Sequence, residues 1–205
     1  MRPYFKIFLL CAIAYAALCP PVSPQTNVAP ESPLSAAGHR YFTDTLLVTQ
    51  YGAPVALYSD LLKGKVVVIN AFFATCTDSC PKMAATLEAL QSRLGDRFGK
   101  DVYFLSFSVD PETDTPAKLK AYAERFHARP GWLFLTGDPK NVDFALRRLG
   151  QKVARKEDHF TLFMIGNERT GLWTKVLPSS GADSVMNTVS CVLGDNKDNC
   201  LHEKQ

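Results

Sequence analysis

The stretch KVVVINAFFATCTDSCPKM, residues 65–83, joins a run of apolar, β-branched residues to two cysteines four positions apart. A continuous run of this kind is typical of a central strand buried on both faces. After Cys80, apolar residues recur at helical spacing up to Phe98, and Gly99 predicts the end of a helix. The stretch therefore predicts a buried strand, a loop that carries Cys76, and a helix that begins at Cys80.

The other predicted elements alternate between strands and helices. Thr115 and Asp138 each precede a proline, a pairing typical of a helix N-terminus, and Gly52 lies in a predicted hairpin turn. The predicted strands cover 44–50, 54–60, 102–110, 132–137, 160–166 and 171–177, and the predicted helices cover 115–128, 138–150 and 182–194. This order indicates the α/β class. It fits a thioredoxin-like fold with an N-terminal β-hairpin and a central mixed sheet flanked by helices, with Cys76 and Cys80 at the first strand-to-helix junction.

The composition is that of an ordinary globular protein, with 46% apolar and 21% charged residues in a chain of 205. This length favours one domain with flanking segments. The formal net charge is +3 and charges of both signs are spread along the chain. Because no basic stripe is present, we expect no nucleic-acid partner.

The N-terminal segment has the pattern of a secretory signal: Arg2 and Lys6 precede an apolar run from Ile7 to Cys19. The run has about 13 residues, fewer than the ~20 of a membrane-spanning helix, so a retained anchor is the alternative. Pro, Ser and Ala then predominate, which is typical of a flexible linker. We expect an exported protein of the bacterial periplasm. Its signal peptide is either cleaved or retained as an N-terminal anchor in the inner membrane. The predicted segments are a signal peptide or short anchor at 1–22, a linker at 23–38, the thioredoxin-like domain at 39–194 and a tail at 195–205.

The pair of cysteines at the junction allows three interpretations: a redox pair, a metal site or a structural disulfide. A helix N-terminus carries unpaired N–H groups and a partial positive charge, which favour a thiolate over a thiol. Pro81 suits an early helical position. Two neighbouring thiolates can oxidise to a disulfide or can together hold one soft metal ion. The polar residues between Cys76 and Cys80 weaken the structural interpretation, because a buried pair would not need them.

A metal site needs a third ligand, and His159 is the best placed of the four histidines. It directly precedes the predicted strand 160–166, where thioredoxins place a cis-proline, and this chain has no proline between Pro139 and Pro178. Two thiolates and one imidazole suit Cu(I) and can also hold Cu(II). A structural zinc would require a fourth ligand. We expect Asp158 to lie at the surface or beside the site, not to be a ligand.

Three motifs resemble the Sco/SenC family of copper-binding proteins: TCTDSCP, SFSVDPETDTPAKLKAYA and DHFTLFMIG. They lie in the family's order, and the resemblance covers residues 41–182. It implies a thioredoxin-like fold and copper binding by Cys76, Cys80 and His159. It also implies a role in cytochrome c oxidase assembly, either delivering copper to the binuclear site of subunit II, or to another copper acceptor, or reducing the thiols of that site.

Two regions stand apart from this interpretation. In the C-terminal segment, Cys191 and Cys200 bracket a polar loop, and we predict a disulfide between them, with two separate thiols as the alternative. The loop that contains Asp110 and Asp114 offers too few oxygen ligands for a calcium or magnesium site. We interpret this loop as structural, or as a surface for a partner.

The alternative function is an extracytoplasmic thiol–disulfide oxidoreductase. In that case Cys76 and Cys80 would form a redox-active catalytic pair, His159 would be unnecessary, and a thiol–disulfide reductant would be a partner. A thiol peroxidase has the same fold class but would need an arginine beside the reactive cysteine, and the sequence shows none there.

Overall fold

The computed structural model describes residues 32–158 and 161–195. The α-helices are α1 (Pro33–Phe42), α2 (Ser79–Leu94), α3 (Pro116–Arg125), α4 (Pro139–Arg148) and α5 (Gly181–Leu193). The strands are β1 (Leu46–Thr49), β2 (Pro54–Ala56), β3 (Val66–Phe72), β4 (Val102–Ser108), β5 (Trp132–Thr136), β6 (Phe163–Asn167) and β7 (Leu172–Val176). Within the described ranges, no helix is both long enough and apolar enough to cross a membrane.

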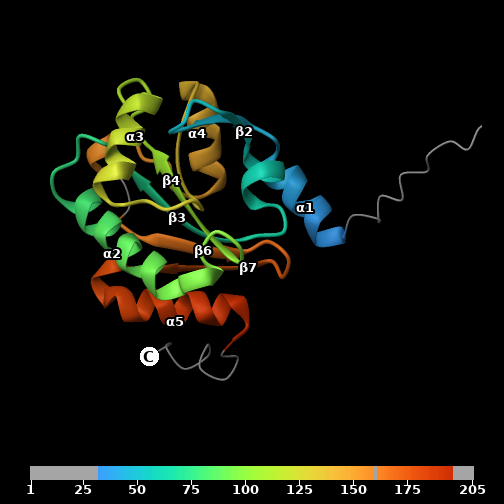
Figure 1. Cartoon of the computed structure of the whole chain (residues 1–205). Coiled ribbons are helices and arrows are strands. Elements are labelled where there is room, and N and C mark those ends of the chain that lie inside the picture. Colours follow the sequence, from blue (N-terminus) through green and yellow to red (C-terminus); the bar gives the residue numbers. More distant parts are fainter. Residues whose placement is uncertain (1–31, 159–160, 196–205) are drawn as a thin grey trace, which may run out of the picture. The chain divides into compact units, whose positions relative to one another are not determined.

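The strands form one mixed seven-stranded sheet in the order β2-β1-β5-β4-β3-β6-β7. β3, β4 and β5 are parallel neighbours, whereas β6 runs antiparallel to β3 and β1 runs antiparallel to β5. Helices lie on both faces of the sheet (Figure 1). The α/β class and the thioredoxin-like fold, with its N-terminal hairpin, are therefore confirmed.

Strand β3 divides the interior into two hydrophobic clusters. All of its residues are buried, and Val66 and Val68 face one cluster while Val67 and Ile69 face the other. The first cluster, here called the cysteine-side core, is completed by residues of α2, α3 and α5 and contains Cys80. The second is completed by residues of α1, the turn after β2, and α4. The alternation follows from the period of two along a strand.

Several local predictions are confirmed. The Thr115 hydroxyl accepts a hydrogen bond from the Lys118 N–H at 3.4 Å, and the Asp138 carboxylate accepts from the Lys140 N–H at 2.8 Å. Gly52 has a φ of 77° in the turn between β1 and β2, which suits glycine. The two predicted C-terminal strands pair as an antiparallel hairpin.

The prediction of a flexible linker is wrong for residues 33–38, which belong to α1. The Ser32 hydroxyl caps this helix by accepting from the Ser35 N–H at 3.1 Å, and Pro33 occupies its first turn. Phe42 is buried at its other end, so the helix gains a tertiary contact that composition does not reveal. The rest of the predicted linker and the predicted signal lie outside the described residues.

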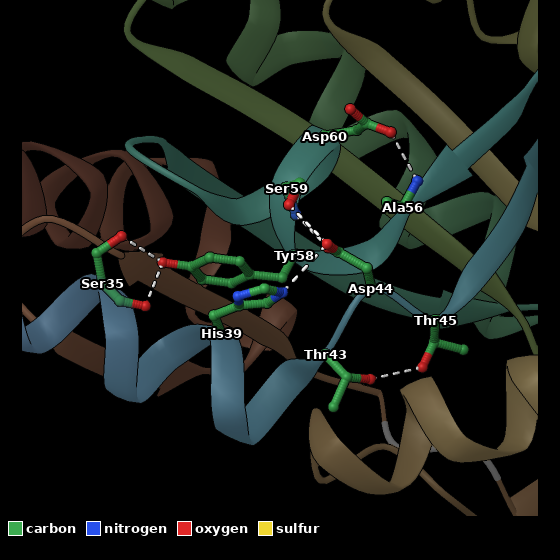
Figure 2. Close-up of polar contacts among 9 residues, drawn as sticks. All are labelled: Ser35, His39, Thr43, Asp44, Thr45, Ala56, Tyr58, Ser59 and Asp60. Atoms are coloured by element: carbon green, nitrogen blue, oxygen red, sulfur yellow. Dashed lines mark hydrogen bonds and ion pairs between the residues drawn. The ribbon is translucent and has the colours of Figure 1, made fainter. Parts of the chain in front are cut away.

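The predicted strand 54–60 is also too long, because β2 ends at Ala56 and a single π-helical turn follows at Leu57–Leu62. The turn buries its apolar side chains, and α1 packs against it. Figure 2 shows the polar contacts at this junction: the Tyr58 hydroxyl lies against Ser35, and the His39 ring bonds to the Asp44 carboxylate at 3.1 Å. Because this turn buries side chains on both of its sides, its residues do not follow the alternation of buried and exposed positions that is expected of a strand.

Candidate metal centre

Cys76 lies in the loop between β3 and α2, and Cys80 is the second residue of α2, as predicted. Both are thiols and neither forms a disulfide. The Cys80 N–H donates to the Cys76 sulfur at 3.4 Å, and the Ser79 hydroxyl lies 3.9 Å from the same sulfur. The start of the helix thus turns its backbone donors toward Cys76, which is the arrangement that stabilises a thiolate.

The two thiols differ in their burial and acidity. Burial opposes ionisation of Cys76, but hydrogen bonds from Cys80, Asp78 and Ser79 outweigh it and lower the pKa of this thiol below its ordinary 9.0. Cys80 is 1% exposed, and burial, with the adjacent Cys76, raises the pKa of its thiol to about 12. The expectation that the helix N-terminus favours both thiolates is therefore wrong for Cys80, because desolvation outweighs the helix effect there.

A buried carboxyl group holds the loop that leads to Cys76. Asp114 is fully buried and accepts hydrogen bonds from the Ala74 N–H at 3.1 Å and from the Ser108 hydroxyl at 2.6 Å. Burial raises the pKa of Asp114 above its ordinary value, against the effect of these two donors. The structural interpretation of this loop is confirmed for Asp114, which ties the start of the cysteine loop to the segment after β4.

The segment before β6 lies beside the same loop. The Lys156 ammonium is 2.7 Å from the Asp110 carboxylate and 5.4 Å from the centre of the Phe73 ring. Asp158 forms an exposed ion pair with Arg155 at 2.8 Å, in agreement with its predicted surface position. His159 itself lies outside the described residues.

Sheet register explains why these segments meet. Because β6 is antiparallel to β3, with Met164 opposite Ile69, the start of β6 lies beside the end of β3 that leads to the cysteines. Within the described ranges, no group of three or more His, Cys, Asp or Glu side chains could hold a metal ion. Because His159 lies outside these ranges, the set of Cys76, Cys80 and His159 stays a prediction.

Of the predicted disulfide between Cys191 and Cys200, the structure describes only Cys191. Cys191 lies near the end of α5 and is disulfide-bonded. Cys200 lies outside the described residues, so its pairing with Cys191 stays a prediction.

Sequence reasoning did not identify Tyr122 as part of this region. It lies in α3 and packs into the cysteine-side core with Cys80. Its inward position follows from the apolar spacing of Leu119, Tyr122 and Ala123. That spacing predicts burial of the side chain, but it gives no sign that the hydroxyl lacks a partner among the described residues.

Comparisons with known proteins agree with this geometry. A family model described as SCO1/SenC matches residues 37–194. The SCO1 protein homolog of Bacillus subtilis is 38% identical over 111 residues, which are 53% of this chain and 56% of the relative. The matched segment thus spans little more than half the length of that relative.

Solved structures match over most of the described fold. A structure of BsSco, described as a member of the Sco family of cytochrome c oxidase assembly proteins, has a TM-score of 0.60 and 29% identity, covering 73% of this chain and 91% of that one. Bradyrhizobium japonicum ScoI with copper bound has a TM-score of 0.59 and 26% identity, covering 72% of this chain and 96% of that one. Because the family model spans both cysteines, the strand that follows His159 and most of the fold, this chain belongs to the SCO1/SenC family.

Proposed function

We propose that the protein binds copper through the thiolates of Cys76 and Cys80 and the imidazole of His159, and passes it to an acceptor in cytochrome c oxidase assembly. The observation that carries this proposal is the reduced, asymmetric cysteine pair at the start of α2, within the range matched by the family model. Copper bound to a family relative of 26% identity supports the choice of metal. Two soft sulfur ligands and one imidazole suit Cu(I) and also accept Cu(II).

The asymmetry of the pair suits the uptake and release of a metal. Cys76 is partly exposed and has the more acidic thiol, so it can meet an incoming ion or a partner's thiolate first. Cys80 is buried, and its thiol must lose a proton when the metal displaces it. Partner thiolates would then replace the two sulfurs one at a time, beginning with Cys76.

The third ligand is supported by its neighbours in the chain. Lys156 lies beside Asp110 and over Phe73, so the chain three residues before His159 already contacts the cysteine loop. After it, β6 runs beside β3. Both flanking contacts favour His159 over His127, which is paired with Glu88 on α2 and exposed.

The proposal extends to the copper acceptor and to the cellular compartment. We propose subunit II of cytochrome c oxidase, or another copper acceptor, as the receiving partner, with reduction of the acceptor's thiols as a second use of the pair. The oxidoreductase alternative is not favoured, because the relatives are described by copper and oxidase assembly. The basic and apolar N-terminal pattern supports export to the periplasm.

Copper titration of the reduced protein tests the proposal, with thiolate-to-copper charge transfer as the signal. We expect one copper per chain, with near-complete loss of the band in Cys76→Ser and Cys80→Ser. His159→Ala should weaken binding by about 10- to 100-fold or more, because it removes one of three ligands.

His127→Asn is the matched histidine control, since asparagine tolerates the φ of 47° at this position. It should bind copper as the wild type does. If His159→Ala leaves stoichiometry and affinity unchanged, the three-ligand site is wrong. If the reduced wild-type protein takes up no copper but reduces a disulfide substrate, the oxidoreductase alternative replaces the proposal.

A further inference from the structure

A pocket of about 400 Å³, here called the α1 pocket, lies between α1 and the β6–β7 hairpin. Apolar side chains form most of its wall, among them Tyr41 and Phe42 of α1 and Met164 and Trp173 of the hairpin. The Trp173 ring lies 5.5 Å from that of Phe42 and packs over Gly166, where an added Cβ would come within 2.1 Å of it. Phe42 and Met164 belong to the second hydrophobic cluster, so the pocket is separate from the cysteine-side core.

One cation lines this otherwise apolar wall. The Arg148 guanidinium lies 5.0 Å from the centre of the Tyr41 ring and 5.0 Å from that of Phe144, and these cation–π contacts hold it in place. Arg148 is half-buried, and no carboxylate pairs with it in the described part of the chain. The one carboxylate in the wall, that of Glu168, already accepts two hydrogen bonds at 2.7 Å. The pocket therefore offers a guanidinium to an anionic group beside apolar walls.

The rim of the α1 pocket is exposed and apolar. Leu34 is 52% exposed and Tyr41 is 49% exposed, and a Leu34 methyl lies 3.6 Å from where a Cβ would stand at Gly171. The next residue, Leu172, is 45% exposed. Large apolar side chains exposed together indicate a binding surface. Tyrosine and tryptophan, which both line this pocket, are enriched where a membrane meets water.

The order of the chain brings this pocket close to the predicted N-terminal signal or anchor. The predicted apolar run ends at Cys19, and α1 begins at Pro33. The intervening residues, 20–32, span at most about 45 Å when fully extended. A retained anchor would thus keep α1 within that distance of a bilayer. An anionic lipid has both groups that the pocket would bind, a negative head for Arg148 and an acyl chain for the apolar wall.

We propose that the α1 pocket binds an anionic membrane lipid, with the phosphate on the Arg148 guanidinium and an acyl chain against Phe42, Met164 and Trp173. This inference does not depend on the proposed copper binding. It gives the folded domain a membrane contact of its own, in addition to any attachment through the N-terminus. Figure 1 shows α1 and α2 on opposite sides of the domain, so a lipid at α1 leaves the cysteine pair accessible.

Tryptophan fluorescence of the full-length, copper-free protein tests the proposal. Of the two tryptophans, Trp173 lines the pocket, whereas Trp132 is 1% exposed in the cysteine-side core. The probe is a vesicle of phosphatidylcholine and phosphatidylglycerol in which the acyl chains of one of the two lipids carry bromine, a short-range quencher of tryptophan. At equal bromine content, we expect brominated phosphatidylglycerol to quench more strongly than brominated phosphatidylcholine. Trp173→Phe should remove most of this quenching.

Arg148→Met removes the cation and keeps an apolar side chain. It should raise the vesicle concentration for half-maximal quenching about five-fold and abolish the difference between the two brominated lipids. Arg125→Met is the matched control, because that guanidinium also lies over two rings, 5.1 Å from Tyr122 and 5.3 Å from Phe126, but belongs to α3. The control should be quenched as the wild type is.

Ala37→Phe is a second variant, because Ala37 lines the pocket from an exposed position on α1. The larger side chain should fill the pocket and reduce quenching, while the melting temperature stays at the wild-type value. Equal quenching by the two brominated lipids in the wild type would overturn the proposal. So would wild-type quenching in Trp173→Phe, because the bromine would then act outside the pocket, or in Arg148→Met, because the guanidinium would then not bind the lipid.

Discussion

Each of the two hydrophobic cores contains a buried tyrosine: Tyr58 in one and Tyr122 in the other. In the core beneath α1, the Tyr58 hydroxyl donates to the Glu168 carboxylate at 2.7 Å. In the cysteine-side core, the Tyr122 hydroxyl has no partner among the described residues, and burial raises its pKa.

The two regions therefore differ in whether their buried tyrosine hydroxyl finds a hydrogen-bond partner among the described residues. Beneath α1, Glu168 also accepts the Gly64 N–H at 2.7 Å, so the polar groups there satisfy one another. In the cysteine-side core, the buried Tyr122 hydroxyl has no partner among the described residues. Polar groups left unsatisfied in a native protein tend to mark a functional site, because stability is given up there for binding.

The largest effect expected from this comparison is the difference in reactivity between the two cysteines. Alkylation of the reduced protein with iodoacetamide near pH 8, followed by peptide mass spectrometry, should modify Cys76 at least roughly 100-fold faster than Cys80, because the thiolate is the nucleophile. The pH profile for Cys76 should have its midpoint below 9.0, whereas the pKa of Cys80 is raised to about 12. Equal rates after denaturation are the control, and equal rates in the native protein would contradict the asymmetry.

The next effect concerns the satisfied region. Glu168→Ala should lower the free energy of unfolding by about 2–4 kcal/mol, because it leaves the Tyr58 hydroxyl and the Gly64 N–H buried without their acceptor. Urea denaturation measures the change, and Glu168→Gln, which keeps one acceptor, should lose less. Copper stoichiometry should stay at the wild-type value, and its loss would show that the two regions are coupled.

A smaller effect is expected at Asp114, the buried carboxyl of the cysteine side. Because burial raises its pKa above 3.8 in the folded state, the folded protein binds this proton more tightly than the unfolded chain does. Its contribution to stability is therefore present below about pH 4 and is lost as pH rises through the folded-state pKa.

Asp114→Asn cannot titrate, so it should lose this pH dependence. Urea denaturation from pH 4 to pH 7 should show the stability of wild type, relative to the variant, falling as pH rises. A difference that stays constant, or that grows with pH, would show that the hydrogen bonds from Ala74 and Ser108 dominate over burial.

The smallest effect is expected at the contact between the β6 approach and the cysteine loop. Lys156→Ala removes the ion pair with Asp110 and the contact over Phe73, and should weaken copper binding only a few-fold, because such contacts contribute roughly 0.5–1 kcal/mol. Lys82→Ala is the matched control, since Lys82 pairs with Asp78 at 2.6 Å in a far more exposed setting. If both variants behave alike in a copper titration, the Lys156 contact does not position the segment before His159.

Local patterns in the sequence predicted most of the fold. The apolar run of β3, the caps at Thr115 and Asp138 and the turn at Gly52 are all determined by residues near one another in the chain. The same holds for the positions of Cys76 and Cys80 at the strand-to-helix junction. Where tertiary contacts outweighed local pattern, as in α1 and the π-helical turn at Leu57–Leu62, the prediction was wrong.

The sequence by itself determined which residues carry the chemistry: a cysteine pair at the start of a helix, in an order of strands and helices that fits the SCO1/SenC family. Only the tertiary structure decided that the two sulfurs are unequal, because the burial of Cys80 depends on the helices and strands that pack around it. It also decided that Tyr122, more than 40 positions after Cys80, places in the same core a hydroxyl that has no partner among residues 32–158 and 161–195. Desolvation and hydrogen-bond satisfaction depend on neighbours in space, so spacing along the chain could not predict either.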